Sequence, residues 1–293
     1  MRDRPDGERE ADGRSSVGSA VVRRRPTRLL QPATGFLRGY THTLNPYVGC
    51  AFGCAYCYVR RMPVALFRGQ PWGAWLEIKE GAAALLVREL RAAKRKGPVT
   101  IFMSSATDPY QPAEFRERVT RGLLAAMLEE PPDVLFVQTR SPLVVRDVDL
   151  FRGLREAGTE LLISVTVETD RDDVRRAFAP ASPPITARLG ALARLRAAGV
   201  PTQAAVAPVL PCTERFASLL ARVTDLVVID DYWMGDGSGG RRTERLGVRA
   251  VYERLGLADW YSPDAWRGVA AQLVSVFGES RVRVSCEGFR PTF

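Results

Sequence analysis

Short apolar runs alternate with longer stretches of helical period from residue 97 onward. The apolar runs, which we predict to be β-strands, are Val99–Met103, Val134–Thr139, Leu161–Val167, Thr202–Val209 and Leu226–Ile229. The stretches of helical period, which follow the first four runs in turn, are Ala113–Leu128, Val148–Ala157, Ile185–Ala198 and Glu214–Val223. Strands that are apolar throughout are buried on both faces, so this pattern predicts an α/β fold with a parallel sheet.

The pattern extends toward the N-terminus. A strand near Thr41–Tyr47 and a helix at Gly81–Lys96 bring the number of βα units to about six. That is too few for a complete TIM barrel, so the pattern fits either a partial barrel or a doubly wound sheet. We expect a further strand at Trp72–Ile78 to lie outside the regular set.

Polar residues follow the predicted strands, at the end where both architectures bind their ligands. These residues are Ser104, Ser105, Thr107 and Asp108, then Arg140 and Ser141, Glu168 and Thr169, and finally Asp230 and Asp231. The two last carboxylates are candidates for binding a substrate amine. We expect the nearby tryptophans and tyrosines to belong to the core or the cap.

The two ends of the chain differ from this central part. Residues 1–33 are polar and show no apolar period, so we predict a disordered tail. Residues 34–234 hold the regular pattern. Residues 235–293 begin with the glycine-rich run GDGSGG, and we predict a flexible loop followed by a helical cap.

Charge and composition narrow the class of protein. The 293 residues include 42 Lys and Arg and 33 Asp and Glu, a net charge of +9. Nucleic acid is therefore a possible partner, although the arginine-rich composition is also typical of a GC-rich genome. No apolar run reaches the length of a membrane span, and the charged N-terminus does not resemble a secretory signal. We expect a cytoplasmic protein with no membrane partner.

Three of the five cysteines, Cys50, Cys54 and Cys57, lie in one short loop. Thiolates at this C-x3-C-x2-C spacing can converge on one metal centre, and the glycines Gly49 and Gly53 allow the backbone to wrap closely around it. A cubane iron–sulfur cluster takes one cysteine more than the loop supplies. One iron would then remain open, and an open coordination position is typical of a centre that performs chemistry.

Two other interpretations of this loop remain. A structural zinc ion would need a fourth ligand, for which His42, Cys212 or Cys286 are candidates. Structural zinc usually uses paired C-x2-C units, however, and no second pair is present. The three thiols could also be buried without a metal. The residues favour a cluster over both, and we expect Cys212 and Cys286 to be free buried cysteines.

The loop NPYVGCAFGCAYCYVR, with Tyr56 before its last cysteine, resembles the radical S-adenosylmethionine (SAM) superfamily. Together with SSATDPYQPAE, QTRSPLVVRDVDL, ISVTVET and APVLP, in that order, it resembles the spore photoproduct lyase-like branch. The resemblance runs from about Thr41 to about Ile229. It implies a partial (β/α)6 TIM-like barrel with a C-terminal extension.

The resemblance also implies a set of site residues. Cys50, Cys54 and Cys57 would hold a [4Fe-4S] cluster whose open iron binds the amino and carboxylate groups of SAM. The residues that would contact SAM itself are Tyr56 and Pro208 with Val206 near the adenine, Ser105, Thr107 and Asp108 at the methionine end, Arg140 at the carboxylate, and Ser164, Thr166 and Glu168 at the ribose. Asp108 could instead form a turn or a helix N-cap.

The implied activity is that of a radical SAM enzyme with an unassigned substrate. A flavodoxin- or ferredoxin-type donor would reduce the cluster, SAM would be cleaved to a 5′-deoxyadenosyl radical, and that radical would abstract hydrogen from the substrate. Tyr58 matches a tyrosine of the family's hydrogen-return path and is our candidate catalytic residue.

The sequence departs from the photoproduct lyase pattern at one position, and this departure argues against thymine-dimer repair. Photoproduct lyases place a cysteine hydrogen donor in the segment that here reads Ser104-Ser105-Ala106-Thr107. A DNA photoproduct lyase is therefore an alternative. So is a cluster- or zinc-containing nucleic-acid-binding protein without catalysis, although such a protein would not need polar residues at every strand end.

Overall fold

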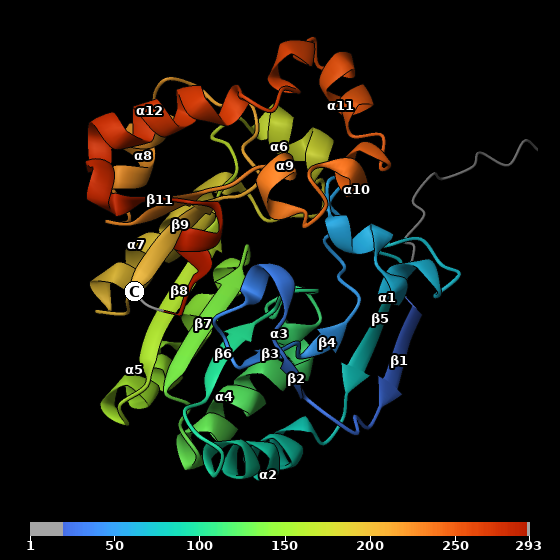
Figure 1. Ribbon diagram of the computed structural model, residues 1–293, viewed down its shortest axis with the longest axis vertical. Coiled ribbons are helices and arrows are strands. Elements are labelled where there is room, and N and C mark those ends of the chain that lie inside the picture. The colour runs from blue at the N-terminus through green and yellow to red at the C-terminus, as the bar shows by residue number, and fades with distance from the viewer. Residues whose placement is uncertain (1–19, 292–293) are drawn as a thin grey trace, which may run out of the picture.

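The computed structural model describes residues 20–291, which form a large and a small β-sheet with helices around them (Figure 1). The strands of the large sheet are β2 (Leu30–Pro32), β3 (His42–Leu44), β6 (Thr100–Met103), β7 (Val134–Thr139), β8 (Glu160–Thr166), β9 (Thr202–Val206), β10 (Val227–Ile229) and β11 (Val282–Val284). Their order is β11-β10-β9-β8-β7-β6-β3-β2. All neighbours are parallel except β2 and β3, which are antiparallel.

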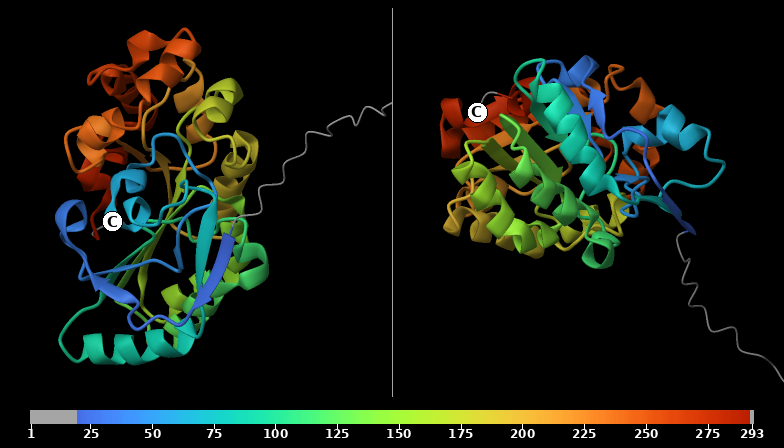
Figure 2. Two further views of the ribbon diagram at one scale, coloured as in Figure 1. Left: turned by 90° about the vertical axis from the view of Figure 1, so that its right-hand side faces the viewer. Right: turned by 90° about the horizontal axis from the view of Figure 1, so that it is seen from below.

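The small sheet stands beside the large one (Figure 2). Its strands, in the order β1-β5-β4, are β1 (Ala20–Arg24), β5 (Trp75–Lys79) and β4 (Tyr47–Val48). β1 pairs parallel with β5, and β4 pairs antiparallel with β5. The small sheet thus links the N-terminal strand to the segment that leads into the cysteine loop.

The helices connect the strands and form the cap. The α-helices are α1 (Pro63–Leu66), α2 (Ala82–Lys94), α3 (Glu114–Glu117), α4 (Val119–Glu129), α5 (Val148–Glu156), α6 (Asp172–Phe178), α7 (Ile185–Ala197), α8 (Phe216–Ala221), α9 (Tyr232–Gly235), α10 (Arg241–Glu244), α11 (Arg249–Arg254) and α12 (Ala265–Phe277). The 3-10 helices are η1 (Gly35–Leu37), η2 (Tyr58–Arg61), η3 (Pro142–Asp147), η4 (Ala258–Trp260), η5 (Glu279–Arg281) and η6 (Ser285–Phe289). Among them, none combines the length and hydropathy of a membrane span.

The main hydrophobic core lies between one face of the large sheet and the helices α2, α4, α5, α7, α8 and α12. The apolar stripes of these amphipathic helices supply leucines such as Leu86, Leu123 and Leu192, which are fully buried. The opposite face carries a smaller aromatic core, in which the rings of Phe102 and Phe136 stack at 4.8 Å. This arrangement confirms the predicted parallel α/β sheet.

On β6, β7 and β8, the face of the sheet that carries the aromatic core becomes polar toward the carboxyl end of the strand. On β7, Phe136 packs in the aromatic core, whereas Gln138 and then Arg140 line a pocket at the carboxyl end. Alternate residues of a strand share a face, so this succession is a direct consequence of the sequence. The C-terminal η6 closes the apolar end, where Phe289 contacts Phe136 at a centroid distance of 6.0 Å.

Part of the predicted N-terminal tail is ordered. Within residues 1–33, the described residues include β1 and β2, so the expectation of disorder is wrong for residues 20–33; residues 1–19 lie outside the described part. All five residues of β1 are exposed. This edge strand is therefore held by backbone pairing with β5 rather than by buried side chains, so its sequence has no apolar period from which it could be predicted.

The predicted helix at Ala113–Leu128 is two helices, α3 and α4, separated at Arg118, where φ is +51°. The cause is Glu114, whose carboxylate accepts hydrogen bonds from the backbone N–H groups of Thr120 and Arg121 at 2.9 and 3.2 Å. Glu114 therefore satisfies the free donors at the start of α4, as an N-cap would.

The C-terminal segment also differs from its prediction. β11 adds a seventh parallel strand to the six that were predicted, and it pairs with β10. The glycine-rich run after α9 is held by Asp236, which accepts hydrogen bonds from Ser238, Gly240, Arg242 and Thr243. The helix α6 was not predicted. The expected strand at Trp72–Ile78 is confirmed as β5, outside the large sheet.

Candidate active site

The three clustered cysteines lie in the loop after β4 and line a pocket of about 590 Å³ at the carboxyl ends of the parallel strands. All three are free thiols, and Cys54 is buried. The other possible ligands are elsewhere: His42 lies on β3 beside Thr41, and neither Cys212 nor Cys286 lines this pocket. The structure therefore brings together the residues of the C-x3-C-x2-C motif and no other cysteine.

Hydrogen bonds from the β6 side fix the cysteine loop. The Gly49 carbonyl accepts from the Thr107 hydroxyl and, at 3.3 Å, from Gln111 Nε2. Gln111 Oε1 in turn accepts from the Ala51 N–H at 2.9 Å. Gly49 has φ +90°, and a Cβ there would lie 2.7 Å from the Trp75 carbonyl oxygen. Only glycine fits this close approach of the loop to β5.

Burial and mutual repulsion both oppose ionisation of the three thiols. Burial, together with the neighbouring Cys54, raises the pKa of Cys57 to about 12. The pKa of Cys50 rises for the same reasons, with Asp108 contributing. A cationic iron–sulfur centre would remove this repulsion, and three thiolates that leave one position open suit such a centre.

Within residues 20–291, no three His, Cys, Asp or Glu side chains are arranged to hold one metal ion. In a cubane cluster each thiolate binds a different iron, so its donors are spread more widely than those around a single ion. The three thiols in the pocket wall thus fit a cluster by their chemistry.

A buried ion network joins Tyr56 of the cysteine loop to the residues that follow β7 and β8. Arg140 Nη1 donates to Glu168 Oε1 at 2.6 Å and to the Tyr56 hydroxyl at 2.8 Å, and Tyr56 donates to the same carboxylate oxygen. Glu168 Oε2 accepts from Arg188 Nη1 at 2.5 Å. Arg140 Nε and Nη2 bond no described residue. The Nε–Nη2 edge of its guanidinium is thus available to an anion in the pocket.

Two arginines keep Glu168 ionised. Burial alone would raise the pKa of its carboxyl, but the charges of Arg188 and Arg140 outweigh burial and lower it to about 2. With two guanidinium groups around one carboxylate, the network retains a positive charge beside the pocket. A carboxylate of a ligand is the natural counter-ion for such a site.

Asp108 acts as a brace between two strand ends. Its Oδ1 accepts from the Thr139 hydroxyl at 2.7 Å and from the Tyr110 N–H at 2.9 Å, and its Oδ2 accepts from the Arg140 N–H at 2.8 Å. The bond from the Tyr110 N–H closes a turn at Asp108, as one of the two interpretations of this residue predicted. The same bonds fix the backbone of Arg140.

The candidate SAM contacts are divided by the structure into two groups. Those that line the pocket are Tyr56, Ser105, Thr107, Asp108, Arg140, Thr166 and Pro208, and the candidate catalytic residue Tyr58 lines it with them. Ser164, Glu168 and Val206 do not line it. Ser164 is fully buried and accepts a hydrogen bond from Gln203 Nε2 at 3.1 Å. The ligand roles of all these residues stay predictions.

Two polar residues of this region were not anticipated. Gln138 lines the pocket and donates to the Thr166 hydroxyl at 2.7 Å; its place between Phe136 and Arg140 in a strand of period two could have revealed it. Arg188 is fully buried on α7. It lies three residues after Ile185 and four before Leu192, so the helical period could have revealed its burial, although not its partner.

The family model described as "Radical SAM superfamily" matches residues 44–215, from β3 to the turn before α8. The chain belongs to the radical SAM superfamily. That match covers the cysteine loop and the four parallel strands β6 to β9, which confirms the family inferred from the motifs.

Relatives of this radical SAM protein occur in distant organisms. It is 30% identical over 173 residues to the uncharacterized protein MJ0683 of Methanocaldococcus jannaschii, which covers 59% of this chain and 62% of that protein. It is 32% identical over 176 residues to the uncharacterized protein Rv2578c of Mycobacterium tuberculosis, covering 59% of this chain and 50% of that one. The matched part thus spans only about half to three-fifths of these relatives.

Solved structures of spore photoproduct lyase share the fold of this radical SAM protein. A tyrosine-to-phenylalanine variant superposes with a TM-score of 0.62 at 12% identity, covering 95% of this chain and 87% of that chain. The lyase in complex with a dinucleoside spore photoproduct gives a TM-score of 0.60 at 12% identity, covering 90% and 81%. The predicted radical SAM fold with its C-terminal extension is confirmed.

Proposed function

We propose that this protein is a radical SAM enzyme that holds a [4Fe-4S] cluster on Cys50, Cys54 and Cys57 and binds SAM beside it. The observation that carries the proposal is that these three thiols share one pocket with Arg140, whose Nε and Nη2 have no hydrogen-bond partner among the described residues. When bound, the cluster and SAM supply one-electron cleavage of the sulfonium and abstraction of a hydrogen atom from the substrate.

The chain's own residues bind and orient the ligand. Arg140 offers Nε and Nη2 to the SAM carboxylate, while Glu168 and Asp108 hold its guanidinium and its backbone in place. Because Glu168 is ionised and itself held by Arg188, this orientation does not depend on pH in the neutral range. Such a fixed wall lowers the cost of orienting the bound ligand.

Tyr58 is the residue that we propose for hydrogen transfer. It follows Cys57 directly, lines the pocket, and donates its hydroxyl hydrogen to the Ser105 carbonyl at 2.7 Å. Burial raises the pKa of Tyr58, so the phenol keeps its hydrogen throughout the neutral range. We assign it to the return of hydrogen after the substrate has reacted. The photoproduct itself is not the substrate that we propose, because residues 104–107 contain no thiol.

Anaerobic reconstitution with iron and sulfide tests this function. After addition of dithionite and SAM, 5′-deoxyadenosine is measured by mass spectrometry; we expect it from the native protein and from Cys212→Ala, but not from Cys54→Ala. Cys212 is a matched control because it is a free cysteine outside the pocket. A colourless protein that binds stoichiometric zinc and forms no 5′-deoxyadenosine would instead support the nucleic-acid-binding alternative.

A further inference from the structure

A second depression, of about 440 Å³, lies on the outer side of the cysteine loop. We call it the Phe115 groove. Its lining is almost entirely apolar and consists of Phe52, Tyr110, Pro112, Phe115, Ser141, Pro142, Leu143, Ala181 and Pro183. Phe115 is 69% exposed, which is unusual for a large apolar side chain on a helix. Exposed apolar surface of this kind marks sites of protein association.

The groove touches the cysteine loop itself. Phe52 stands between Cys50 and Cys54 in the sequence, is only 2% exposed, and lines the groove. Tyr110 and Pro112, which also line it, flank the Gln111 that bonds the loop at Gly49 and Ala51. The loop therefore has two sides. Its three cysteines line the pocket, and Phe52 between them lines the groove.

The exposed charges on and next to α3 that have no ion-pair partner among residues 20–291 are both arginines. On α3, Glu114 is buried and paired with Arg146, and Glu117 is paired with Arg23 at 2.8 Å. Arg116 and Arg118 are exposed and form no ion pair with residues 20–291. The free charges beside Phe115 are thus both positive, and an acidic partner complements them.

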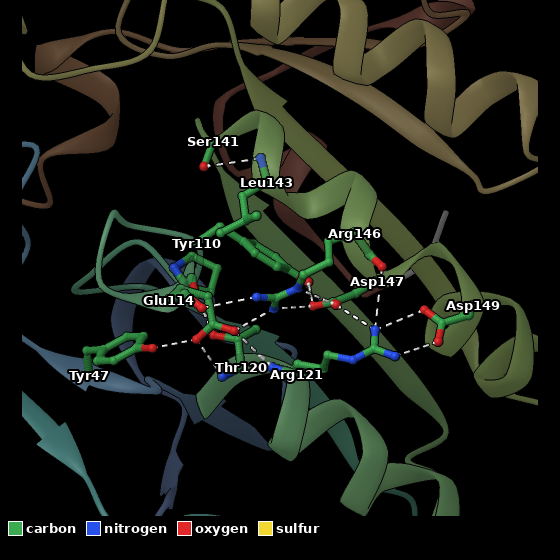
Figure 3. Close-up of polar contacts among 11 residues, drawn as sticks. Tyr47, Tyr110, Glu114, Thr120, Arg121, Ser141, Leu143, Arg146, Asp147 and Asp149 are labelled. Atoms are coloured by element: carbon green, nitrogen blue, oxygen red, sulfur yellow. Dashed lines mark hydrogen bonds and ion pairs between the residues drawn. The ribbon is translucent and has the colours of Figure 1, made fainter. Parts of the chain in front are cut away.

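The groove stands on a rigid base. Figure 3 shows Tyr110 and Leu143 above the ion network of Glu114, Arg146 and Asp147. Arg146 Nη2 donates to Glu114 Oε1 at 2.6 Å and to Asp147 Oδ2 at 2.8 Å, and both carboxylates are fully buried. These ion pairs fix α3 against η3. A preformed surface of this kind needs little rearrangement when a partner binds.

From these observations we propose that the Phe115 groove docks an acidic one-electron carrier protein of the flavodoxin class. This inference rests on the proposed function, because the carrier would deliver its electron to the cluster on the inner side of the loop. One electron leaves the flavin hydroquinone, which becomes the semiquinone, and the cluster gains that electron. Phe52 lies between carrier and cluster and keeps water away from the path.

Stopped-flow reduction of the cluster-loaded protein tests the docking site. The bleaching of cluster absorbance is followed after mixing with a bacterial flavodoxin in its hydroquinone form and, separately, with dithionite. We expect Phe115→Ala and Arg116→Glu each to slow reduction by flavodoxin about tenfold or more, while dithionite reduces all variants alike. Binding of oxidised flavodoxin, measured by calorimetry, is expected to weaken in parallel and to weaken with salt.

Phe67→Ala is the matched control, because Phe67 is 88% exposed but does not line the groove. Normal flavodoxin reduction of Phe115→Ala and Arg116→Glu, or a selective loss in Phe67→Ala, would overturn the docking site. A native protein that dithionite fails to bleach would instead count against the proposed function, so the two failures are distinguishable. Circular dichroism of each variant shows whether the fold is retained.

Discussion

Arg188 is a buried cation that pairs with the Glu168 carboxylate and does not line the pocket. It is fully buried, its Nη1 bonds Glu168 Oε2 and the Thr166 carbonyl at 2.5 and 3.0 Å, and its Nε and Nη2 have no hydrogen-bond partner among the described residues. Leaving two donors unpaired is costly. The position makes sense because, without Arg188, the buried Glu168 would have only Arg140 to compensate its charge.

Replacing this arginine tests that account. We expect Arg188→Met to lower the free energy of unfolding by about 3 kcal/mol, because it leaves a buried carboxylate poorly compensated. Adding Glu168→Gln should recover part of the loss, since the second change removes that charge. Urea unfolding measures both, with Arg194→Met on the exposed face of α7 as the control. Equal effects of the two arginine changes would contradict the argument.

Asp230 is a buried carboxyl whose ionisation destabilises the folded protein. It is 6% exposed, lines the pocket, and forms no ion pair with the described residues. Burial raises its pKa from 3.8 to about 7, so the folded protein holds this proton more tightly than the unfolded chain does. Stability contributed by the protonated form is present below pH 4 and is lost as the pH rises toward 7.

The raised pKa of Asp230 predicts how the stability of an Asp230→Asn variant depends on pH. An amide cannot ionise, so we expect the variant to be more stable than the native protein at pH 8 by a few kcal/mol, about the amount that a shift of this size implies. At pH 4 the two should differ little. Thermal unfolding across this range gives the measurement, and the exposed Asp259→Asn is the control. An unchanged difference between pH 4 and pH 8 would exclude the argument.

Among the elements, α3 shows how a side chain can end one helix and begin another. Glu114 accepts hydrogen bonds from Tyr47 on β4, from two N–H groups of α4, and from Arg146 on η3 (Figure 3). It therefore joins elements that are far apart in the sequence. No single-sequence pattern predicts such a junction, because the apolar period runs through it without interruption.

Loss of the charge at this junction should cost stability. We expect Glu114→Gln to lower the free energy of unfolding by about 3 kcal/mol, since Arg146 loses its buried partner while the amide retains some hydrogen bonds. Glu129→Gln, at the exposed end of α4, is the matched control. Chemical denaturation distinguishes the two. A change below the control's value would show that Asp147 alone suffices for Arg146.

The strands that could be predicted are those buried on both faces, such as β7 and β8, where Val, Leu and Ile follow one another. β1, β2 and β11 were missed because they are short edge strands with polar residues. The three cysteines and the residues at the strand ends could be placed from spacing and topology. The pairing of Arg140 with Glu168 could not, because it depends on side-chain directions across two loops.

At the scale of the whole molecule, the end of the chain returns to the sheet. Phe289 of η6 contacts both Phe36 near the N-terminus and Phe136 in the inner core, at 5.8 and 6.0 Å. Just before it, the Gly288 carbonyl accepts from Gln203 at 2.9 Å. A segment that was predicted to be only a cap thus completes the core of the domain.

Gly288 is the point at which this closure is tightest. A Cβ there would lie 2.2 Å from Val228 Cγ2, so we expect Gly288→Ala to lower the free energy of unfolding by about 2 kcal/mol through overpacking. Gly268→Ala on α12 meets open space and should instead raise stability slightly. Thermal unfolding compares the two variants. Equal melting temperatures would mean that η6 is free to move away from β10.

The cysteine loop has a thermodynamic consequence for loading of the cluster. Thr107 and Gln111 hold its backbone at Gly49 and Ala51 through the protein's own hydrogen bonds. Folding of the domain has therefore already removed most of the conformational entropy of this loop. Assembly of the proposed cluster would not have to order the chain again, so more of the free energy of iron–thiolate bonding would contribute to its affinity.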